Sequence, residues 1–147
     1  MRKIALAAIV VVAFLGATPA FAGYWSGTGS YVPWTEPDGN VVYPWNEWYG
    51  SLIDGSFNGN WEENNPKYQG GGVLYRTFTG SIISYYTSVD GGDTYGHCEG
   101  EWSRSHDGWY QACGWFTMEF NLTDGTCEGK WASYDKTAKG IMTGTGY

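Results

Sequence analysis

The chain has 147 residues and a formal net charge of −7, and aromatic residues make up 18% of it. Nucleic acid and anionic lipid bind basic surfaces, so this acidic balance argues against both as partners. The length fits one domain, and the three cysteines are too widely spaced for a zinc motif.

The first 22 residues have the pattern of a secretory signal peptide. Arg2 and Lys3 precede an apolar run over residues 4–15, and Ala20-Phe21-Ala22 is the small-residue pattern that signal peptidase reads. The run is too short for a permanent membrane helix, and no later stretch is apolar enough for an integral membrane segment. We expect cleavage near Ala22, which changes the charge from −7 to −9 by removing two basic residues. The mature chain, residues 23–147, is then secreted, periplasmic or held at the cell surface.

The mature part is rich in residues that favour strands. All 9 Trp and 12 Tyr lie in it, and aromatic side chains fit pleated sheets better than helices. No apolar stripe with a period of 3.6 residues appears after residue 22. We therefore predict a single all-β domain over residues 23–147, in which buried aromatic side chains face glycines on neighbouring strands.

A first strand is predicted over residues 24–31, and a loop rich in proline and aromatic residues follows it. A turn at Pro37-Asp38-Gly39-Asn40 folds the two arms of this loop against each other. Aromatic faces stack on sugar rings and apolar ligands, and carboxylates accept hydrogen bonds from hydroxyl groups. The loop is our candidate ligand-binding site; the alternative is that it caps a barrel mouth and binds nothing. The candidate residues are Tyr31, Trp34, Glu36, Asp38, Tyr43 and Trp45.

The next segment, residues 47–63, has a strong hairpin signal. It carries the pattern Leu-x-Asp-Gly-Ser-x-x-Gly-x-Trp, starting at Leu52. Asp-Gly between two alternating segments indicates a two-residue turn, because glycine adopts positive φ without strain. A turn centred on Asp54-Gly55 places Trp48 opposite Trp61, with the apolar side chains on one face.

Residues 73–89 read as one long strand, or two short strands, bent at Gly80. Further strands are predicted over residues 95–104 and 109–121. His97 alternates with two glutamates along one face of the first of these, whereas the opposite face is apolar. Such a face could hold a metal or serve acid-base chemistry, but the simpler interpretation is a wet outer surface.

The cysteine count is odd, so at least one thiol is unpaired or bonded between chains. Cys98 and Cys113 flank the same predicted turn. One register sets them opposite each other, which allows a disulfide, and a turn one residue longer sets Cys98 opposite Gly114 instead. Cys127 is the expected odd one out.

A second copy of the hairpin pattern starts at Leu122. A turn centred on Asp124-Gly125 places Met118 opposite Trp131 and Glu119 opposite Lys130, the latter as an exposed ion pair. A final strand is predicted over residues 139–147.

About eight strands, joined in sequence order by hairpins, form a meander with two free edges. Free edges promote aggregation, and an even number of strands lets the first and last strand pair antiparallel. We predict an up-and-down barrel, with a two-sheet sandwich as the alternative fold.

No constellation of residues indicates an enzyme, and we expect no cofactor and no metal site. The aromatic excess favours an exported, non-enzymatic binding module for a carbohydrate or a small apolar ligand. The alternative is a structural or interaction protein of the cell surface or extracellular matrix. Nothing in the sequence sets the oligomeric state.

Overall fold

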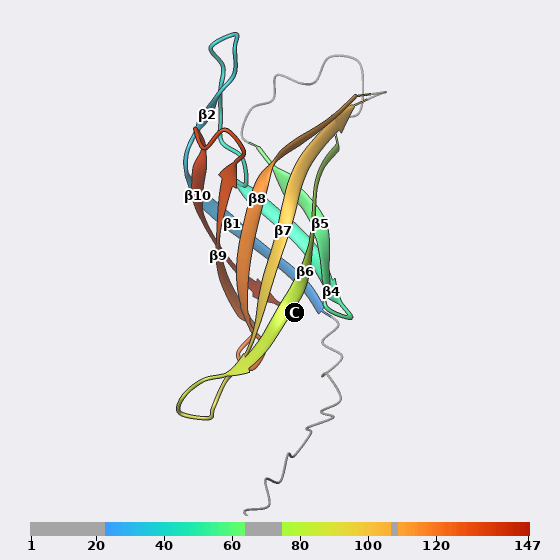
Figure 1. The fold of residues 1–147 in the computed structure, drawn as a ribbon, viewed down its shortest axis with the longest axis vertical. Helices are drawn as coiled ribbons and strands as arrows, with labels where there is room; N and C mark the ends of the chain where they lie inside the picture. The colour runs from blue at the N-terminus through green and yellow to red at the C-terminus, as the bar shows by residue number, and fades with distance from the viewer. Residues whose placement is uncertain (1–22, 64–74, 107–108) are drawn as a thin grey trace, which may run out of the picture.

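The computed structural model describes residues 23–63, 75–106 and 109–147, so the expected signal peptide lies outside it. The described residues form no helix, and eight of their strands close into an antiparallel barrel (Figure 1). The barrel strands, in spatial order, are β1 (Gly23–Val32), β10 (Lys139–Gly146), β9 (Thr126–Ser133), β8 (Trp109–Asn121), β7 (Thr94–His106), β6 (Tyr75–Thr87), β5 (Ser56–Glu62) and β4 (Glu47–Ile53). Two short strands, β2 (Trp34–Thr35) and β3 (Val41–Val42), pair in the loop between β1 and β4.

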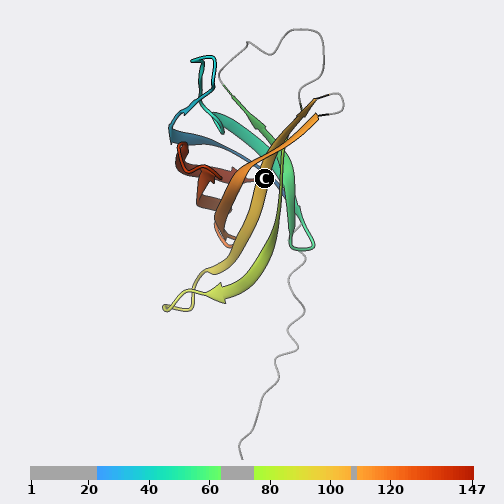
Figure 2. The same ribbon diagram turned by 45° about the horizontal axis from the view of Figure 1, so that its top comes forward.

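The first and last strands close the barrel, as the meander argument predicted. β1 pairs with β10, where Trp25 lies opposite Gly146, and with β4, where Trp25 lies opposite Gly50. The barrel, and not the two-sheet alternative, is therefore the fold. The long strands β6, β7 and β8 run diagonally within the wall. β6 and β7 project beyond the other strands at one end, and β7 and β8 project at the opposite end (Figure 2).

The core consists of aromatic rings seated over glycines, which confirms the predicted alternation of large and small residues. Phe78 covers the pair Gly50 and Gly59, where an added Cβ would lie 2.7 and 2.6 Å from the tip of its ring. Phe116 covers Gly80 and Gly100 in the same way. A side chain at any of these four glycines would displace a ring, so the glycines give the aromatic residues room to fill the barrel.

The first Asp-Gly hairpin has the predicted register. Trp48 lies opposite Trp61, and Leu52 lies opposite Phe57. Asp54 and Gly55 have φ values of 50° and 77°, the positive values that a two-residue turn with the twist of the strands needs.

The second Asp-Gly hairpin does not have the predicted register. Met118 lies opposite Gly129, and Glu119 lies opposite Glu128, so the expected pair of Glu119 with Lys130 does not form. The turn takes four residues instead of two, because the Asn121 side chain accepts hydrogen bonds from the backbone amides of Thr123 and Asp124 at 3.0 and 3.2 Å. The slip is two residues, so each side chain keeps its predicted face.

The long strand β6 bends elsewhere than predicted. Gly80 lies opposite Gly100 in unbroken pairing, and the ladder shifts between Ile82 and Ser84 instead. Ile83 is the extra residue of this bulge, and its side chain is exposed.

The disulfide that one register allowed between Cys98 and Cys113 is not formed. Cys98 lies opposite Met118, five residues along β8 from Cys113, which falls at a second bulge. Five strand residues span about 16 Å, more than twice the Cα separation that a disulfide bridges. All three cysteines are free and buried, and burial raises the pKa of Cys98, Cys113 and Cys127 to about 12, 11 and 12.

Candidate functional site

Aromatic side chains fill the interior of the barrel. Trp61 Nε1 donates a hydrogen bond to the backbone oxygen of Ser103 at 3.0 Å, and Trp102 Nε1 donates one to that of Ala132 at 3.2 Å. The two rings meet edge to face, with centroids 5.1 Å apart. Because rings occupy the interior, the hollows to consider as binding sites lie at one rim and on the outer wall.

Trp45, one of the predicted ligand-binding residues, belongs to this core. Its side chain is 0% exposed and packs on Phe78 and Phe116, with ring centroids 5.2 and 5.6 Å away. Trp45 lies just before β4 and has a φ of 63°, a turn conformation that directs the chain into the barrel wall. The sequence shows an aromatic residue in a loop here, but not that the loop turns it inward.

The other predicted site residues lie at the end of β1 or in the loop between β1 and β4. Tyr43 is half-buried. Tyr31 lies in β1 and Trp34 in β2, and their side chains lie outside what the structure describes. Glu36 and Asp38 flank the turn between β2 and β3, where the predicted turn is confirmed by hydrogen bonds from Glu36 N to Asn40 O at 2.8 Å and from Gly39 N to Glu36 O at 2.9 Å.

A hollow of about 590 Å³, called here the mouth pocket, lies beneath this hairpin. Figure 1 shows the β2–β3 hairpin and the β9–β10 turn at the same end of the barrel. Both contribute to the pocket, together with the ends of β7 and β8. Its lining is Thr35, Glu36, Pro37, Asp38, Arg104, Gln111 and Asp135.

The base of the mouth pocket is a buried ion pair. Glu36 is 8% exposed and Arg104 is 5% exposed, and Arg104 NH1 lies 2.9 Å from Glu36 Oε1. Arg104 also donates from Nε and NH2 to Gln111 Oε1 at 3.2 and 3.1 Å, and its guanidinium lies 5.9 Å from the centre of the Trp109 ring. Held from several sides, these polar groups have fixed positions before any ligand arrives.

Two more carboxylates stand at the edge of the mouth pocket. Asp38 is exposed, and its Oδ1 accepts a hydrogen bond from Asn40 N at 3.0 Å. Asp135 Oδ1 accepts one from Thr137 N at 3.0 Å. Hydrogen bonds, that from Ser133 above all, lower the pKa of Asp135 below its ordinary value, so this group is ionised at neutral pH and accepts hydrogen bonds.

Sequence reasoning missed Arg104, Gln111 and Asp135. One signal was available for Arg104: along β7 the even-numbered residues face inward, from Cys98 to Trp102, and Arg104 continues that row. A charged residue on an otherwise apolar face needs a buried partner. The partner, Glu36, is 68 residues away in the chain, and no local pattern connects the two.

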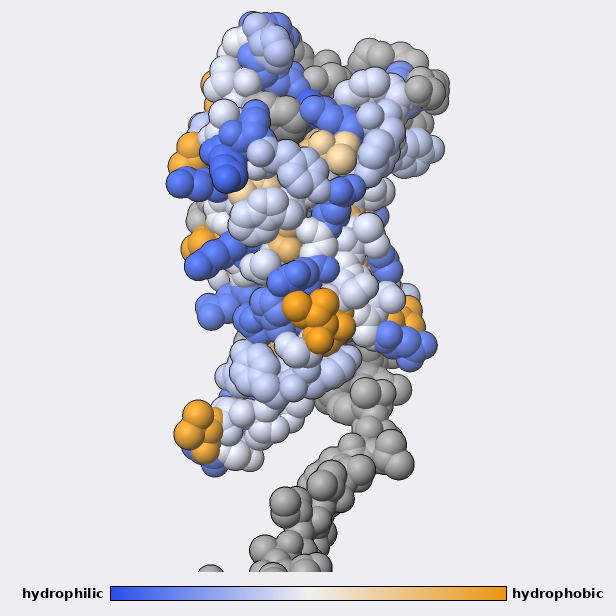
Figure 3. All heavy atoms as spheres, in the orientation of Figure 1, coloured by the Kyte–Doolittle hydropathy of each residue, from blue (hydrophilic) through white to orange (hydrophobic). Residues whose placement is uncertain are grey.

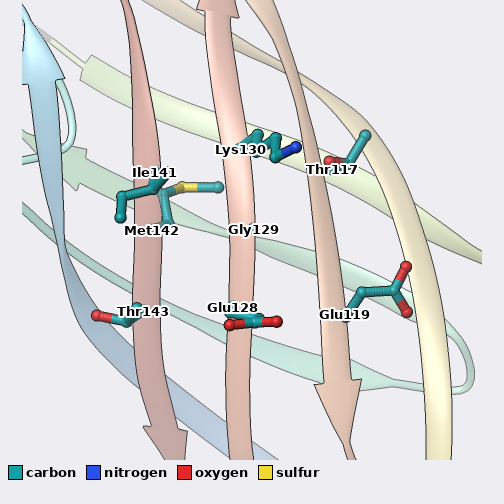
Figure 4. Close-up of a pocket in the computed structure, with 8 residues that line it drawn as sticks. All are labelled: Thr117, Glu119, Glu128, Gly129, Lys130, Ile141, Met142 and Thr143. Atoms are coloured by element: carbon teal, nitrogen blue, oxygen red, sulfur yellow. The ribbon is translucent and has the colours of Figure 1, made fainter.

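On the face seen in Figure 3 hydrophilic residues predominate, and strongly hydrophobic residues are scattered singly among them. A shallow groove of about 330 Å³ crosses strands β8, β9 and β10 on the outer wall. Figure 4 shows that Lys130 and Thr117 lie together at one end of this groove, and Glu128 and Glu119 lie at the other.

His97 lies beside the end of this groove that carries Glu128 and Glu119. Its Nδ1 is hydrogen bonded to Glu119 Oε1, and its Nε2 lies 3.3 Å from Glu99 Oε1. The hydrogen bond to Glu119 is the main cause that raises the pKa of His97 above its ordinary value. Tyr86 donates to the other oxygen of Glu119 at 3.0 Å, so the cluster joins β6, β7 and β8. Among the described residues, no group of three His, Cys, Asp or Glu side chains could hold a metal ion.

Comparison of the chain with protein families, with curated proteins and with solved structures finds no match. Within the described part of the chain, no helix is long and apolar enough to cross a membrane.

Proposed function

We propose that the chain is an exported, non-enzymatic binding module, and that its mouth pocket takes a small glycan-like ligand. The observation that carries the proposal is the buried pair of Glu36 and Arg104 at the base of an open hollow. Buried ion pairs contribute little to stability compared with apolar packing, so one that faces a pocket is well explained by recognition of a ligand.

The chemistry of the mouth pocket suits hydroxyl groups. Carboxylates accept hydrogen bonds from hydroxyls, whereas the Arg104 guanidinium and the Gln111 amide donate to them. Sugar rings present both donors and acceptors at fixed spacing, which a rigid polar pocket can match. Catalysis by a cysteine nucleophile is a poorer fit, because the three thiols are buried and their raised pKa keeps them protonated.

The test is a titration of the protein with neutral mono- and oligosaccharides, followed by melting temperature and intrinsic tryptophan fluorescence. A ligand that binds only the folded state raises the melting temperature. For the saccharide that does so, the double variant Asp38→Asn, Gln111→Leu is expected to bind about tenfold more weakly or worse. Glu99→Gln is the matched control, since it removes the same charge from an exposed position on the outer wall. Equal binding by the double variant and the control contradicts the proposed site.

A structural or interaction protein of the cell surface or matrix is the second candidate. The observation in its favour is the number of exposed aromatic residues, such as Tyr24 and Tyr147, whose rings stack 6.4 Å apart on the surface. This reading predicts that no saccharide raises the melting temperature and that the apparent size on a gel-filtration column grows with protein concentration.

A further inference from the structure

A second hollow, of about 400 Å³, lies on the outer wall and is called here the lysine pocket. The sheet register explains why it forms. Ala132 in β9 lies between Trp115 of β8 and Lys139 of β10. A methyl group between two long side chains leaves a depression. In the next row Lys130 lies opposite Ile141, and Lys136, in the β9–β10 turn, completes the rim.

The positively charged side chains of the described residues that form no ion pair all line the lysine pocket. The three lysines that the structure describes, Lys130, Lys136 and Lys139, all line it, and within the described residues none of them forms an ion pair. The two described arginines are neutralised by carboxylates, Arg76 by Glu63 at 2.6 Å and Arg104 by Glu36 at 2.9 Å. In a chain of net charge −7, three unpaired ammonium groups around one hollow form a site for an anion.

The pocket also offers flat apolar surface. Trp115 is 42% exposed and Ile141 is 53% exposed, and both line the same hollow as the lysines. An indole face stacks on a ring, and an ammonium group attracts a carboxylate. A ligand that uses both features is a ring that carries a negative charge.

The surroundings restrict how much charge that ligand can bear. Lys130 and Ile141 also line the groove of Figure 4, which runs along β9 from the lysine pocket to Glu128 and Glu119. These two carboxylates lie opposite each other across β8 and β9, so this end repels anions. Hydroxyl groups of neutral sugars can donate to them. The groove therefore favours one charged ring at the lysine end, followed by neutral rings.

We propose that the lysine pocket and the adjoining groove bind a saccharide whose terminal ring carries a carboxylate, with that ring on Trp115 and the neutral remainder toward Glu128. The site shares no residue with the mouth pocket, so the proposal does not depend on the proposed function.

The experiment is a calorimetric titration of the protein with 3′-sialyllactose, a carboxylated ring joined to neutral lactose. Lactose and a heparin-derived hexasaccharide, a polyanion, are the comparison ligands. We expect saturable binding of sialyllactose, much weaker binding of lactose and of heparin, and weakening when NaCl is raised to about 0.3 M, where screening shortens the reach of the charges. Absence of sialyllactose binding, lactose binding of equal strength, or a preference for heparin each overturns the proposal.

Two sets of variants locate the site. The triple variant Lys130→Gln, Lys136→Asn, Lys139→Gln is expected to bind sialyllactose about tenfold more weakly or worse, whereas the three Lys→Arg changes keep the affinity. Asn suits residue 136, whose φ is 61°, so the triple variant retains its turn. A triple variant that melts like the unmodified protein and binds equally well overturns the proposal.

The aromatic contact has its own control. Trp115→Ala is expected to weaken sialyllactose binding about fivefold. Tyr49→Ala removes a similarly exposed aromatic side chain that lines neither the lysine pocket nor the mouth pocket, and is expected to leave the affinity unchanged. The mouth variant Asp38→Asn, Gln111→Leu also keeps it. If the mouth variant alone loses sialyllactose, the ligand belongs to the mouth pocket and the lysine pocket is not its site.

Discussion

Replacement of Trp45 by Ala tests whether this residue stabilises the barrel core or contributes to ligand binding. The side chain is 0% exposed, and four rings surround it, those of Phe78 and Phe116 most closely. Truncation of a buried tryptophan costs about 3–5 kcal/mol, because the apolar contacts are lost and the rings around the cavity relax only partly. We therefore expect Trp45→Ala to lower the free energy of unfolding by about 4 kcal/mol.

The assay is urea unfolding followed by far-ultraviolet circular dichroism, which does not depend on tryptophan emission. With a slope of about 2 kcal/mol per molar urea, a loss of about 4 kcal/mol lowers the midpoint by about 2 M. Trp115→Ala is the control, and its exposed ring predicts a much smaller change. Indole should fill the cavity and raise the melting temperature of Trp45→Ala alone. A midpoint equal to that of the unmodified protein would refute the core role of Trp45.

Three further outcomes are expected. Trp61→Phe should destabilise the barrel about 1–3 kcal/mol more than Trp48→Phe in urea unfolding, because Trp61 Nε1 donates a hydrogen bond to the Ser103 oxygen, whereas Trp48 Nε1 has no acceptor among the described residues. Unreduced protein should give three thiols with Ellman's reagent in denaturant and almost none when folded; a native disulfide would leave one. The pKa of His97 is raised above its ordinary value of 6.5 in the folded protein, so protonation of His97 stabilises the fold. This stabilisation is fully present at a pH below 6.5 and is lost as the pH rises through the folded-state pKa. Melting curves across this range should therefore show a decline that His97→Gln lacks; an identical pH profile would exclude this contribution from His97.

The sequence was most informative where a turn is built from backbone constraints alone. Asp54-Gly55 needs no other residue to adopt positive φ, so its register could be predicted residue by residue. The same dipeptide at Asp124-Gly125 behaves differently, because Asn121 hydrogen bonds to two amides and lengthens the turn. Side-chain competition of this kind depends on geometry that the pattern does not contain.

Closure of the barrel was predictable from the strand count. An even number of strands joined by hairpins lets the first and last strand pair antiparallel, and β1 does pair with β10. The glycines give the rings room, as Gly50 and Gly59 do beneath Phe78. The bend in β6 was misplaced because Gly80 is needed for space beneath Phe116, not for backbone freedom.

The mouth pocket was less visible, because it joins segments that are distant in the chain. The loop composition correctly indicated the end of the barrel at which a pocket lies, and Glu36 and Asp38 line that pocket. The other charged lining residues come from elsewhere in the chain, Arg104 from β7 and Asp135 from the β9–β10 turn. Trp45, chosen for its aromatic ring, lies in the core instead. Composition identifies a surface that could bind; only the register decides which side chains face it.

The β9–β10 turn separates the two hollows that we propose as binding sites. Neighbouring residues in this turn point to different hollows, Asp135 to the mouth pocket and Lys136 to the lysine pocket. The turn is fixed by the backbone hydrogen bonds from Ser133 N to Ala138 O at 2.8 Å and from Lys136 N to Ser133 O at 2.9 Å. Asp135 therefore lines one hollow and Lys136 lines the other, with the turn between them. Substitutions at exposed positions of one hollow are expected to leave the shape of the other unchanged.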